Sequence, residues 1–286
     1  MDAPSPPDLV ASPAELRARV AGWRAAGQRV ALVPTMGALH EGHLALVRRG
    51  HEVADRVVVS IFVNPKQFAA GEDLSRYPRR MAADRAALAG RADLVFAPDA
   101  ATMYPDGFGT TVMVAGPSGG FEGDLRPGHF DGVATVVTKL FVQVAPDAAI
   151  FGEKDWQQLQ VVRHLVRDLD LPLSIVPHPT VRDAHGLALS SRNAYLAEAE
   201  LATARRLNVI LRQVASGLAG PDWAGALAEG RDAIAAAGLG PVDYLLPVDA
   251  GSLAPLAGPA PGREIRLLAA VRLGPMRLLD NMPVPG

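Results

Sequence analysis

Five short apolar runs in the first two-thirds of the chain have the pattern of buried β-strands. They are rich in Val, Ile, Leu, Phe and Ala, and the first two end at Pro34 and at Asn64-Pro65. Continuous apolar runs of this length are typical of strands that are covered on both faces of a parallel sheet. The predicted strands are residues 30–33, 57–63, 93–97, 148–151 and 173–176.

Helical periodicity fills segments between these runs. Apolar side chains recur at the i, i+3, i+4, i+7 spacing of an amphipathic helix in two sets, Val133, Val136, Val137, Leu140, Phe141 and Val144, and then Leu159, Val162, Val166 and Leu169. Strands that alternate with helices predict an α/β domain built on a parallel sheet. Ligands of such sheets bind at the carboxyl ends of the strands.

The pattern changes after Arg182, where an Ala-rich region begins. The predicted elements are helices at residues 198–216 and 223–237, strands at 242–248 and 265–271, and a Pro-, Gly- and Ala-rich loop at 252–262. We place a boundary near Val181, so that residues 1–180 form the first domain and residues 181–286 a smaller α+β domain.

Composition narrows the class of protein. With 286 residues, 49% apolar and 20% charged, the chain has the make-up of a globular protein with roughly two domains. A net charge of −2 gives no overall field that favours nucleic acid or anionic lipid. The absence of Cys excludes disulfides, zinc-thiolate sites and a thioester-forming nucleophile. The first ten residues carry an acid and prolines where a signal peptide would have basic residues and an apolar run, and no apolar stretch is long enough to cross a bilayer. We therefore expect a soluble, cytoplasmic protein.

The first candidate site is the segment Leu39-His40-Glu41-Gly42-His43, which follows the first strand and opens a helix. Two imidazoles three residues apart lie on one face of a helix start, beside free backbone N–H groups that suit a phosphate. Gly42 leaves room for a flat group such as a base to approach the backbone. The plainer alternative is a pair of surface histidines in a turn.

Lys154 lies at the end of another predicted strand, in Gly152-Glu153-Lys154-Asp155. Its ammonium can place a compact positive charge on a phosphate, and Gly152 permits a close backbone approach. The alternative is a solvated strand-end lysine.

The segment Ser190-Ser191-Arg192-Asn193 precedes the long Ala-rich helix. Two hydroxyls, a guanidinium and an amide in a row form a dense set of donors for a polyphosphate. The alternative is an ordinary helix N-cap with an exposed arginine.

Polar residues at other strand ends suit a small polar substrate. Asn64 and Gln67 follow the second strand, and Gln158 lies on the helix after Asp155. Arg126 and His129 lie in a Gly-rich loop, residues 124–130, that is a candidate lid. Neither GxGxxG nor GxxxxGK[ST] occurs, and no covalent nucleophile is evident. Neutral and cationic donors of this kind suit charge stabilisation during transfer at a phosphate.

Five motifs in order make the sequence similar to a known family. They are residues 34–43, 59–68, 126–130, 151–155 and 189–193, and the tail at Asp243-Tyr244 and residues 277–281 also matches. With these motifs the chain resembles the pantothenate synthetases, or pantoate–β-alanine ligases, of the HIGH-type nucleotidyltransferase superfamily. The resemblance implies a Rossmann-like, doubly wound parallel sheet, a smaller C-terminal α+β lid domain and a homodimer.

The resemblance also implies the reaction, an ATP-dependent condensation of (R)-pantoate with β-alanine through a pantoyl adenylate, with Mg²⁺ accompanying ATP. The products are pantothenate, AMP and diphosphate, on the route to coenzyme A. We expect no nucleic-acid or membrane partner and no metal held by the protein itself.

Residue roles carry over from the matching motifs. The resemblance assigns His43 as a proton donor, and the charge-stabilising set is His40, His43, Lys154, Ser190, Ser191 and Arg192. The implied ATP-binding residues are Met36, Gly37, Ala38, Leu39, His40, Glu41, Gly42, His43, Gly152, Glu153, Lys154, Asp155, Val181, Leu189, Ser190, Ser191 and Arg192. The implied substrate-binding residues are Gln67 and Gln158, to which we add Asn64 and Arg126.

Three positions depart from the family pattern. Trp156 stands where Tyr is usual, Leu189 where Met is usual, and Met276 where Thr is frequent. Leu for Met is a small change in an apolar contact. Trp156 lacks a hydroxyl and adds bulk, which bears on the substrate pocket more than on the reaction.

Two other functions compete with this ligase activity. One is a nucleotidyltransferase that retains the nucleotide in its product, and the other is a non-catalytic ATP-binding regulator.

Overall fold

The computed structural model describes residues 5–69 and 71–285, which divide into two compact units. The first unit holds residues up to 153 together with 157–179, and the second holds 154–156 together with 180 onward. The three-residue segment Lys154–Trp156 thus groups with the second unit, although its neighbours on both sides in the sequence belong to the first. The units are described separately below.

The first unit contains a six-stranded sheet whose strand pairs are all parallel. The strand order is β1-β4-β3-β2-β5-β6. Its strands are β1 (Asp8–Val10), β2 (Val30–Thr35), β3 (Arg56–Ile61), β4 (Leu94–Phe96), β5 (Ala148–Gly152) and β6 (Ser174–His178). The Rossmann-like α/β prediction is confirmed, and five of the strands match predicted runs. The edge strand β1 was not predicted.

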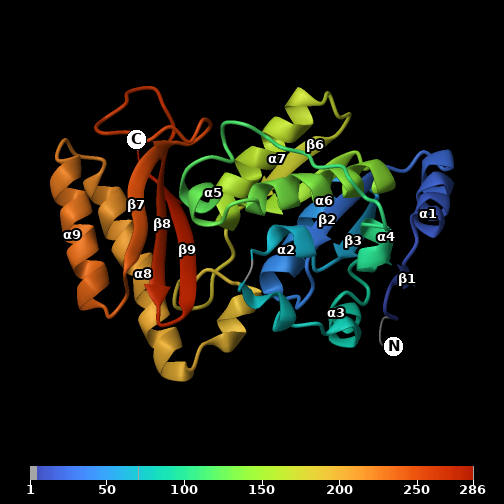
Figure 1. The fold of residues 1–286 in the computed structure, drawn as a ribbon, viewed down its shortest axis with the longest axis horizontal. Helices are drawn as coiled ribbons and strands as arrows, with labels where there is room; N and C mark the ends of the chain where they lie inside the picture. Colours follow the sequence, from blue (N-terminus) through green and yellow to red (C-terminus); the bar gives the residue numbers. More distant parts are fainter. Residues whose placement is uncertain (1–4, 70, 286) are drawn as a thin grey trace. The chain divides into compact units, whose positions relative to one another are not determined.

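Helices alternate with these strands, as Figure 1 shows in blue to yellow. They are α1 (Pro13–Ala25), α2 (Glu41–Val53), α3 (Met81–Ala87), α4 (Ala100–Met103), α5 (Phe121–Leu125), α6 (His129–Val144) and α7 (Trp156–Asp168). Leu44 and Val47 of α2 pack on Ala31 and Val33 of β2. Leu32 lies between those two strand residues and is also fully buried, so both faces of β2 are covered.

The strand order places a topological switch point at β2. The chain continues from β2 to β3 on one side, whereas β5 pairs with β2 on the other. In open α/β sheets, ligands bind outside the carboxyl ends of the strands at such a point. The turn after β2, which carries His40 and His43, and Gly152 at the end of β5 both lie at this edge.

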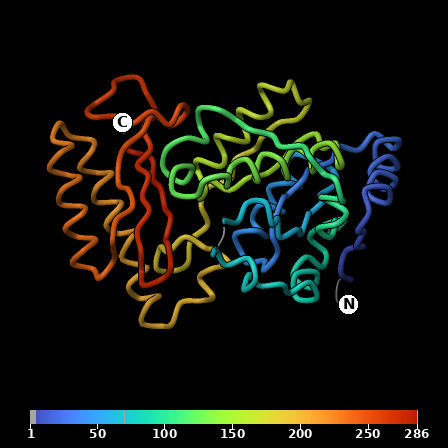
Figure 2. Tube along the Cα trace, in the orientation of Figure 1, coloured from blue at the N-terminus to red at the C-terminus, as the bar shows by residue number. Residues whose placement is uncertain are grey.

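The second unit contains an antiparallel sheet in the order β7-β8-β9. Its elements are α8 (Glu198–Gly217), α9 (Trp223–Ala236), β7 (Val242–Asp249), β8 (Ile265–Leu273) and β9 (Met276–Pro283). The orange and red trace in Figure 2 follows the three strands side by side. This confirms the predicted α+β character, whereas β9 was predicted only as a matching tail and not as a strand.

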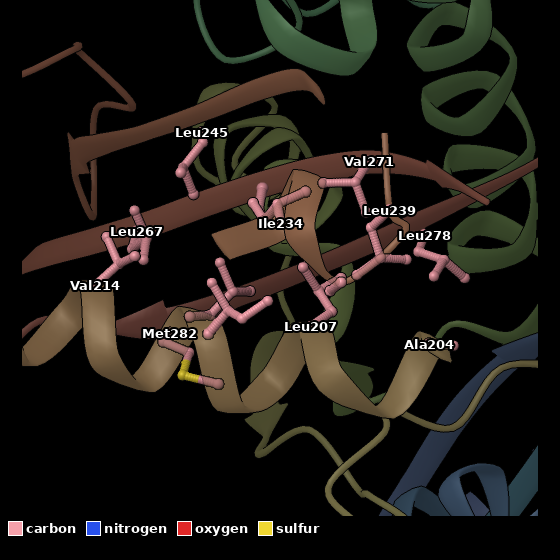
Figure 3. Packing of buried hydrophobic residues seen from close by; sticks show 14 of the residues in the cluster. Ala204, Leu207, Val214, Ile234, Leu239, Leu245, Leu267, Val271, Leu278 and Met282 are labelled. Atoms are coloured by element: carbon pink, nitrogen blue, oxygen red, sulfur yellow. The ribbon is translucent and has the colours of Figure 1, made fainter. Parts of the chain in front are cut away.

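Apolar side chains from α8, α9 and all three strands form the core of this unit. Figure 3 shows Val214 of α8 below Leu267 of β8 and the Met282 side chain of β9 alongside α8; Leu207 of α8 and Ile234 of α9 belong to the same cluster. Because α8 keeps this stripe at helical spacing along its length, burial of one face fixes its orientation on the sheet.

Candidate active site

The turn between β2 and α2 brings the two predicted histidines together. His40 is the N-cap of α2, and His43 stands three residues later in its first turn. The ring centroids are 4.1 Å apart with an interplanar angle of 36°. The prediction that both rings lie on one face of the helix start is confirmed.

Hydrogen bonds fix the tautomer of both histidines. The backbone N–H of Gly42 donates to Nδ1 of His40 at 3.1 Å, and the backbone N–H of His40 donates to Nδ1 of His43 at 3.3 Å. A ring nitrogen that accepts a hydrogen bond carries no proton, so the proton of each neutral imidazole lies on Nε2. Both rings therefore present an Nε2–H donor at the positive end of a helix, which suits an anion.

Asp84, a residue that the sequence analysis did not single out, holds the turn before the histidines. It comes from α3 and is 3% exposed. Its two carboxylate oxygens accept from the backbone N–H groups of Ala38 at 3.0 Å and Leu39 at 2.8 Å. Gly37 and Ala38 both have positive φ, 81° and 51°, a conformation that costs a non-glycine residue about 1–2 kcal/mol. The carboxylate offsets that cost.

A second polar group follows β3 and contains the predicted substrate residues Asn64 and Gln67. The Gln67 amide nitrogen donates to Met36 Sδ at 3.2 Å, which joins it to the turn after β2. Asn64 is 1% exposed, and its amide donates to Gln67 Oε1 and to the carbonyl of Gly132 and accepts from the Tyr104 hydroxyl. Asn64 thus orients Gln67.

Gly132 allows α6 to approach this group closely. A Cβ at this position would lie 2.3 Å from the carbonyl oxygen of Lys66, closer than any side chain tolerates. The close approach is what lets the Gly132 carbonyl reach the Asn64 amide.

Arg126 is joined to its surroundings by several hydrogen bonds. Its Nε and Nη2 donate to the two oxygens of Glu72 at 2.7 and 2.6 Å, and Nη1 lies 3.1 Å from Nε2 of His129. Nδ1 of His129 donates to the backbone carbonyl of Gln67 at 2.8 Å. The predicted lid loop is shorter than expected, because α5 ends at Leu125 and α6 begins at His129. It is anchored to the chain around Gln67.

The charges of this group are consistent with its hydrogen bonds. Burial, followed by the positive charge of Arg126, lowers the pKa of His129, in keeping with an Nε2 atom that accepts from the guanidinium. Burial of the Glu72 carboxyl works against ionisation, but the hydrogen bond and charge of Arg126 outweigh it and hold the pKa of Glu72 below its ordinary value.

Gln158 lies half-buried on α7, and its neighbour Gln157 has a clear structural role. The Gln157 amide nitrogen lies within hydrogen-bond distance of the carbonyls of Pro117, Gly119 and Gly120, and its oxygen accepts from the backbone of Glu122. Gln157 therefore fixes the loop before α5, and Gln158 stays the predicted substrate-binding glutamine of this pair.

In the second unit, a small pocket gathers the predicted cationic and hydroxyl donors. It is lined by Lys154, Leu187, Ala188, Ser190, Arg192, Asn193, Leu207, Met276, Arg277, Leu278, Leu279 and Asp280. Lys154 and the Ser-Arg segment are 36 residues apart in sequence, so their meeting could not be read from local spacing.

The segment around Ser190 differs from the alternative of a cap on the long helix. Ser190 caps the short 3-10 helix Ser191–Tyr195, with its hydroxyl accepting from the Arg192 backbone at 3.3 Å. The α8 helix begins later, at Glu198. Arg192 is half-buried and lines the pocket rather than pointing into open solvent.

Asp280 anchors the stretch of chain that leads to this segment, through Arg182. It receives a bidentate pair from Arg182, at 2.7 and 2.8 Å, and its side chain is 4% exposed. The chain then returns from Arg182 to Leu189, whose backbone N–H donates to the carbonyl of Val181 at 2.9 Å. This hairpin fixes Val181, Leu189 and Ser190 relative to β9.

The remaining predicted nucleotide residues are more open. Glu41 is exposed and pairs with Arg48 at 2.7 Å, whereas Glu153 is half-buried. Asp155 is half-exposed and lies 3.3 Å from the Lys154 ammonium. A carboxylate at that distance neutralises part of the lysine charge until an anion competes for it.

Trp156, one of the departures from the family pattern, is buried in the second unit. Its indole N–H donates to the carbonyl of Ala250 at 2.9 Å, and the Arg266 guanidinium lies 3.7 Å from its ring centroid. The added bulk is therefore accommodated by packing inside this unit.

Within the described ranges, no group of three or more His, Asp or Glu side chains is arranged to hold a metal ion. None of the helices there combines the length and hydropathy needed to cross a bilayer.

Comparison with known proteins identifies the family. The family model described as pantoate-beta-alanine ligase matches residues 8–283. The pantothenate synthetase of Mesorhizobium japonicum is 58% identical, covering 98% of this chain and 99% of that protein. That of Rhodospirillum rubrum is 54% identical, covering 96% and 98%.

Solved structures of pantothenate synthetases match this chain over nearly its whole length. The crystal structure of pantothenate synthetase from Thermus thermophilus matches with a TM-score of 0.90 at 46% identity, covering 98% of this chain and all of that one. A pantoate-beta-alanine ligase from Francisella tularensis, complexed with beta-gamma ATP and beta-alanine, matches with a TM-score of 0.81 at 31% identity, covering 98% and 99%.

Proposed function

The chain belongs to the pantoate-beta-alanine ligase family, and from that premise we propose that it makes pantothenate from pantoate and β-alanine at the expense of ATP. The proposed reaction has two steps. A pantoate carboxylate oxygen attacks the α-phosphorus of ATP, the bond to the bridging oxygen breaks, and diphosphate leaves. The β-alanine amine then attacks the acyl carbon of pantoyl adenylate, the acyl C–O bond breaks, AMP leaves and the nitrogen loses a proton.

The observation that carries this proposal is the histidine pair at the end of β2. Both Nδ1 atoms accept backbone N–H groups, so His40 and His43 are arranged as Nε2–H donors at the start of α2. In the first step, negative charge grows on the phosphate oxygens, and donors already in place stabilise it without reorganisation. His43 would also donate a hydrogen bond from Nε2–H to the departing diphosphate; it would keep this proton, because a neutral imidazole that lost it would become an imidazolate.

Lys154, Ser190, Ser191 and Arg192 supply the second part of this stabilisation in the proposal. Their support is the pocket of the second unit, which Lys154, Ser190 and Arg192 line together. Guanidinium and ammonium groups make charge-assisted hydrogen bonds to phosphate that are roughly twice as strong as neutral ones. The ATP carried by the Francisella relative fits this role.

Gln67 and Gln158 are proposed to hold pantoate. Gln67 is supported by its place next to Met36 and by the Asn64 bond that fixes its amide orientation. We propose that Asn64 and Arg126 act here through position, because the Asn64 amide and the Arg126 guanidinium are occupied by protein groups.

The second step depends on positioning the amine against the adenylate and on excluding water more than on a strong base, since AMP is a good leaving group. The segment from Arg126 to Asp131 is the proposed lid over the adenylate. Its opening would have to exchange the Glu72 and Gln67 contacts of Arg126 and His129 for water.

Mg²⁺ enters this proposal as part of the substrate, bound to ATP phosphates. Magnesium prefers oxygen ligands and commonly binds through substrate phosphates with few protein carboxylates. The homodimer and the cytoplasmic location stay predictions.

The proposal is tested by measuring diphosphate and AMP release from MgATP and pantoate, with and without β-alanine. We expect diphosphate limited to about one enzyme equivalent without the amine and sustained AMP release with it. A nucleotidyltransferase would need no amine and would keep the nucleotide in its product. ATP binding without either product would point to a regulator and contradict the proposal.

A further inference from the structure

The segment Lys154–Trp156 is held by the C-terminal sheet of the second unit. The Asn281 amide nitrogen, from β9, donates to the backbone carbonyl of Lys154 at 2.8 Å. Two residues later, the Trp156 ring lies under the Arg266 guanidinium of β8, 3.7 Å from its carbon. The sheet therefore holds the segment on both sides of Asp155.

These two anchors are joined to each other. Arg266 Nε donates to Asn281 Oδ1 at 2.6 Å, and the two residues are 9% and 3% exposed. The Asn281 amide thus has its oxygen committed to Arg266 and its nitrogen to Lys154. A buried amide with both ends satisfied has one favourable orientation, because reversing it would place like groups against each other.

The residue next to Asn281 holds the other half of the pocket. Asp280 binds Arg182, which begins the hairpin that leads to Ser190, and also accepts from the Asn281 backbone N–H at 2.8 Å. Two consecutive residues of β9 therefore fix the Lys154 backbone and the approach to Ser190, and both halves line one pocket.

We propose that Asn281 is a positioning residue for Lys154, which sets where the lysine ammonium lies relative to Ser190 and Arg192. The inference rests on the proposed function of Lys154 in the adenylation step. A lysine ammonium stands at the end of a flexible four-carbon chain, so its position relative to Ser190 and Arg192 is defined only if the lysine backbone is fixed. A displacement of about 1 Å of a catalytic group can cost about a hundredfold in rate.

Asn281→Asp separates this role from general support of the core. The carboxylate keeps an acceptor for Arg266 but places an oxygen, in place of an N–H donor, against the Lys154 carbonyl. The chain offers a matched control in Asn208→Asp. Asn208 is also 3% exposed, its Oδ1 accepts from Arg212 Nε at 3.0 Å, and its amide nitrogen has no partner among the described residues.

The measurement is single-turnover diphosphate release from saturating MgATP and pantoate, with the KM for β-alanine measured at steady state. We expect Asn281→Asp to slow release about tenfold or more and to leave the KM for β-alanine within about twofold. Asn208→Asp should change neither. In a Lys154→Ala background, Asn281→Asp should add less than about twofold, because its partner is gone.

Three results would overturn the inference. One is an Asn281→Asp rate equal to that of Asn208→Asp, another is an equal loss in the presence and absence of the lysine side chain, and the third is a rise in the β-alanine KM that accounts for the whole defect. Arg266→Met, which removes the bond to Asn281 Oδ1, serves as the second variant if Asn281→Asp does not fold. It must show the same dependence on Lys154 for the inference to stand. A wild-type protein that releases no diphosphate would instead contradict the proposed function.

Discussion

The Asp84→Asn substitution tests how the turn before the histidines is held. Asp84 is buried, and its two carboxylate oxygens accept from the backbone N–H groups of Ala38 and Leu39. An asparagine has nearly the same shape but only one oxygen. One backbone N–H must then face the amide NH₂ group, so one hydrogen bond is lost and a donor faces a donor.

The expected loss of stability follows from the one hydrogen bond that is lost and the one that is weakened. A hydrogen bond to a charged group contributes about 1.5–3 kcal/mol, and the remaining bond weakens because the acceptor is no longer charged. We therefore expect the free energy of unfolding to fall by about 2–3 kcal/mol. Because Ala38 keeps its positive φ only while something holds it, the turn should relax and displace the histidines. The resulting loss in kcat/KM for ATP should be about tenfold to a hundredfold.

Asp93→Asn is the matched control for this loss of stability. The Asp93 carboxylate also accepts a backbone N–H, that of Val57, but at the start of β3 and therefore at the opposite edge of the sheet. Urea unfolding and steady-state kinetics would be measured for both variants. If Asp84→Asn and Asp93→Asn lower stability alike and leave kcat/KM for ATP equally unchanged, Asp84 supports only the fold, and the reasoning is refuted.

Three more predictions concern individual side chains. Lys154→Ala should slow adenylation about a hundredfold with an unchanged melting temperature, since one preorganised charge contact is lost and little packing with it; an unaltered single-turnover rate would remove Lys154 from the mechanism. Gln67→Ala should weaken pantoate binding far more than ATP binding, and calorimetry that found equal losses would argue against its placement. Burial and the charge of Arg126 lower the pKa of His129, so the unfolded chain takes up this proton at higher pH than the folded protein. Stability from His129 is therefore complete above about pH 6.5 and is lost as the pH falls toward the folded-state pKa. His129→Asn should reduce the drop in urea midpoint between about pH 7.5 and about pH 5.5, and an identical drop in both proteins would contradict this.

The elements that could be predicted from the sequence are those with a continuous apolar run or a regular apolar stripe. Strands β2, β3 and β5 are continuous apolar runs, and α6 and α8 keep a clean helical stripe, so burial dictates them locally. Strand β1 has only three residues and two of them are exposed. Strand β9 carries Asp280 and Asn281 in its interior, which breaks the apolar pattern because these side chains bind Arg182 and the Lys154 backbone.

The candidate site also contains one part that local sequence predicts and another that depends on contacts between distant residues. The histidine pair is a local motif, so its geometry follows from spacing at a helix start. Asp84 and Asn281 reach their partners from 45 and 127 residues away along the chain. Asp84 lies in a short Ala-rich helix where nothing nearby in the sequence marks it. Asn281 lies in the stretch 277–281 that matches the family, but that match assigns it no role. Only the folded arrangement shows that they hold the predicted residues in place.

Pantoate labelled with ¹⁸O in its carboxylate shows whether the pantoate carboxylate attacks the α-phosphorus of ATP. We expect one labelled oxygen in AMP and none in diphosphate, because the acyl C–O bond breaks in the second step. Label found in diphosphate or inorganic phosphate, or AMP without label while pantothenate forms, would contradict this expectation.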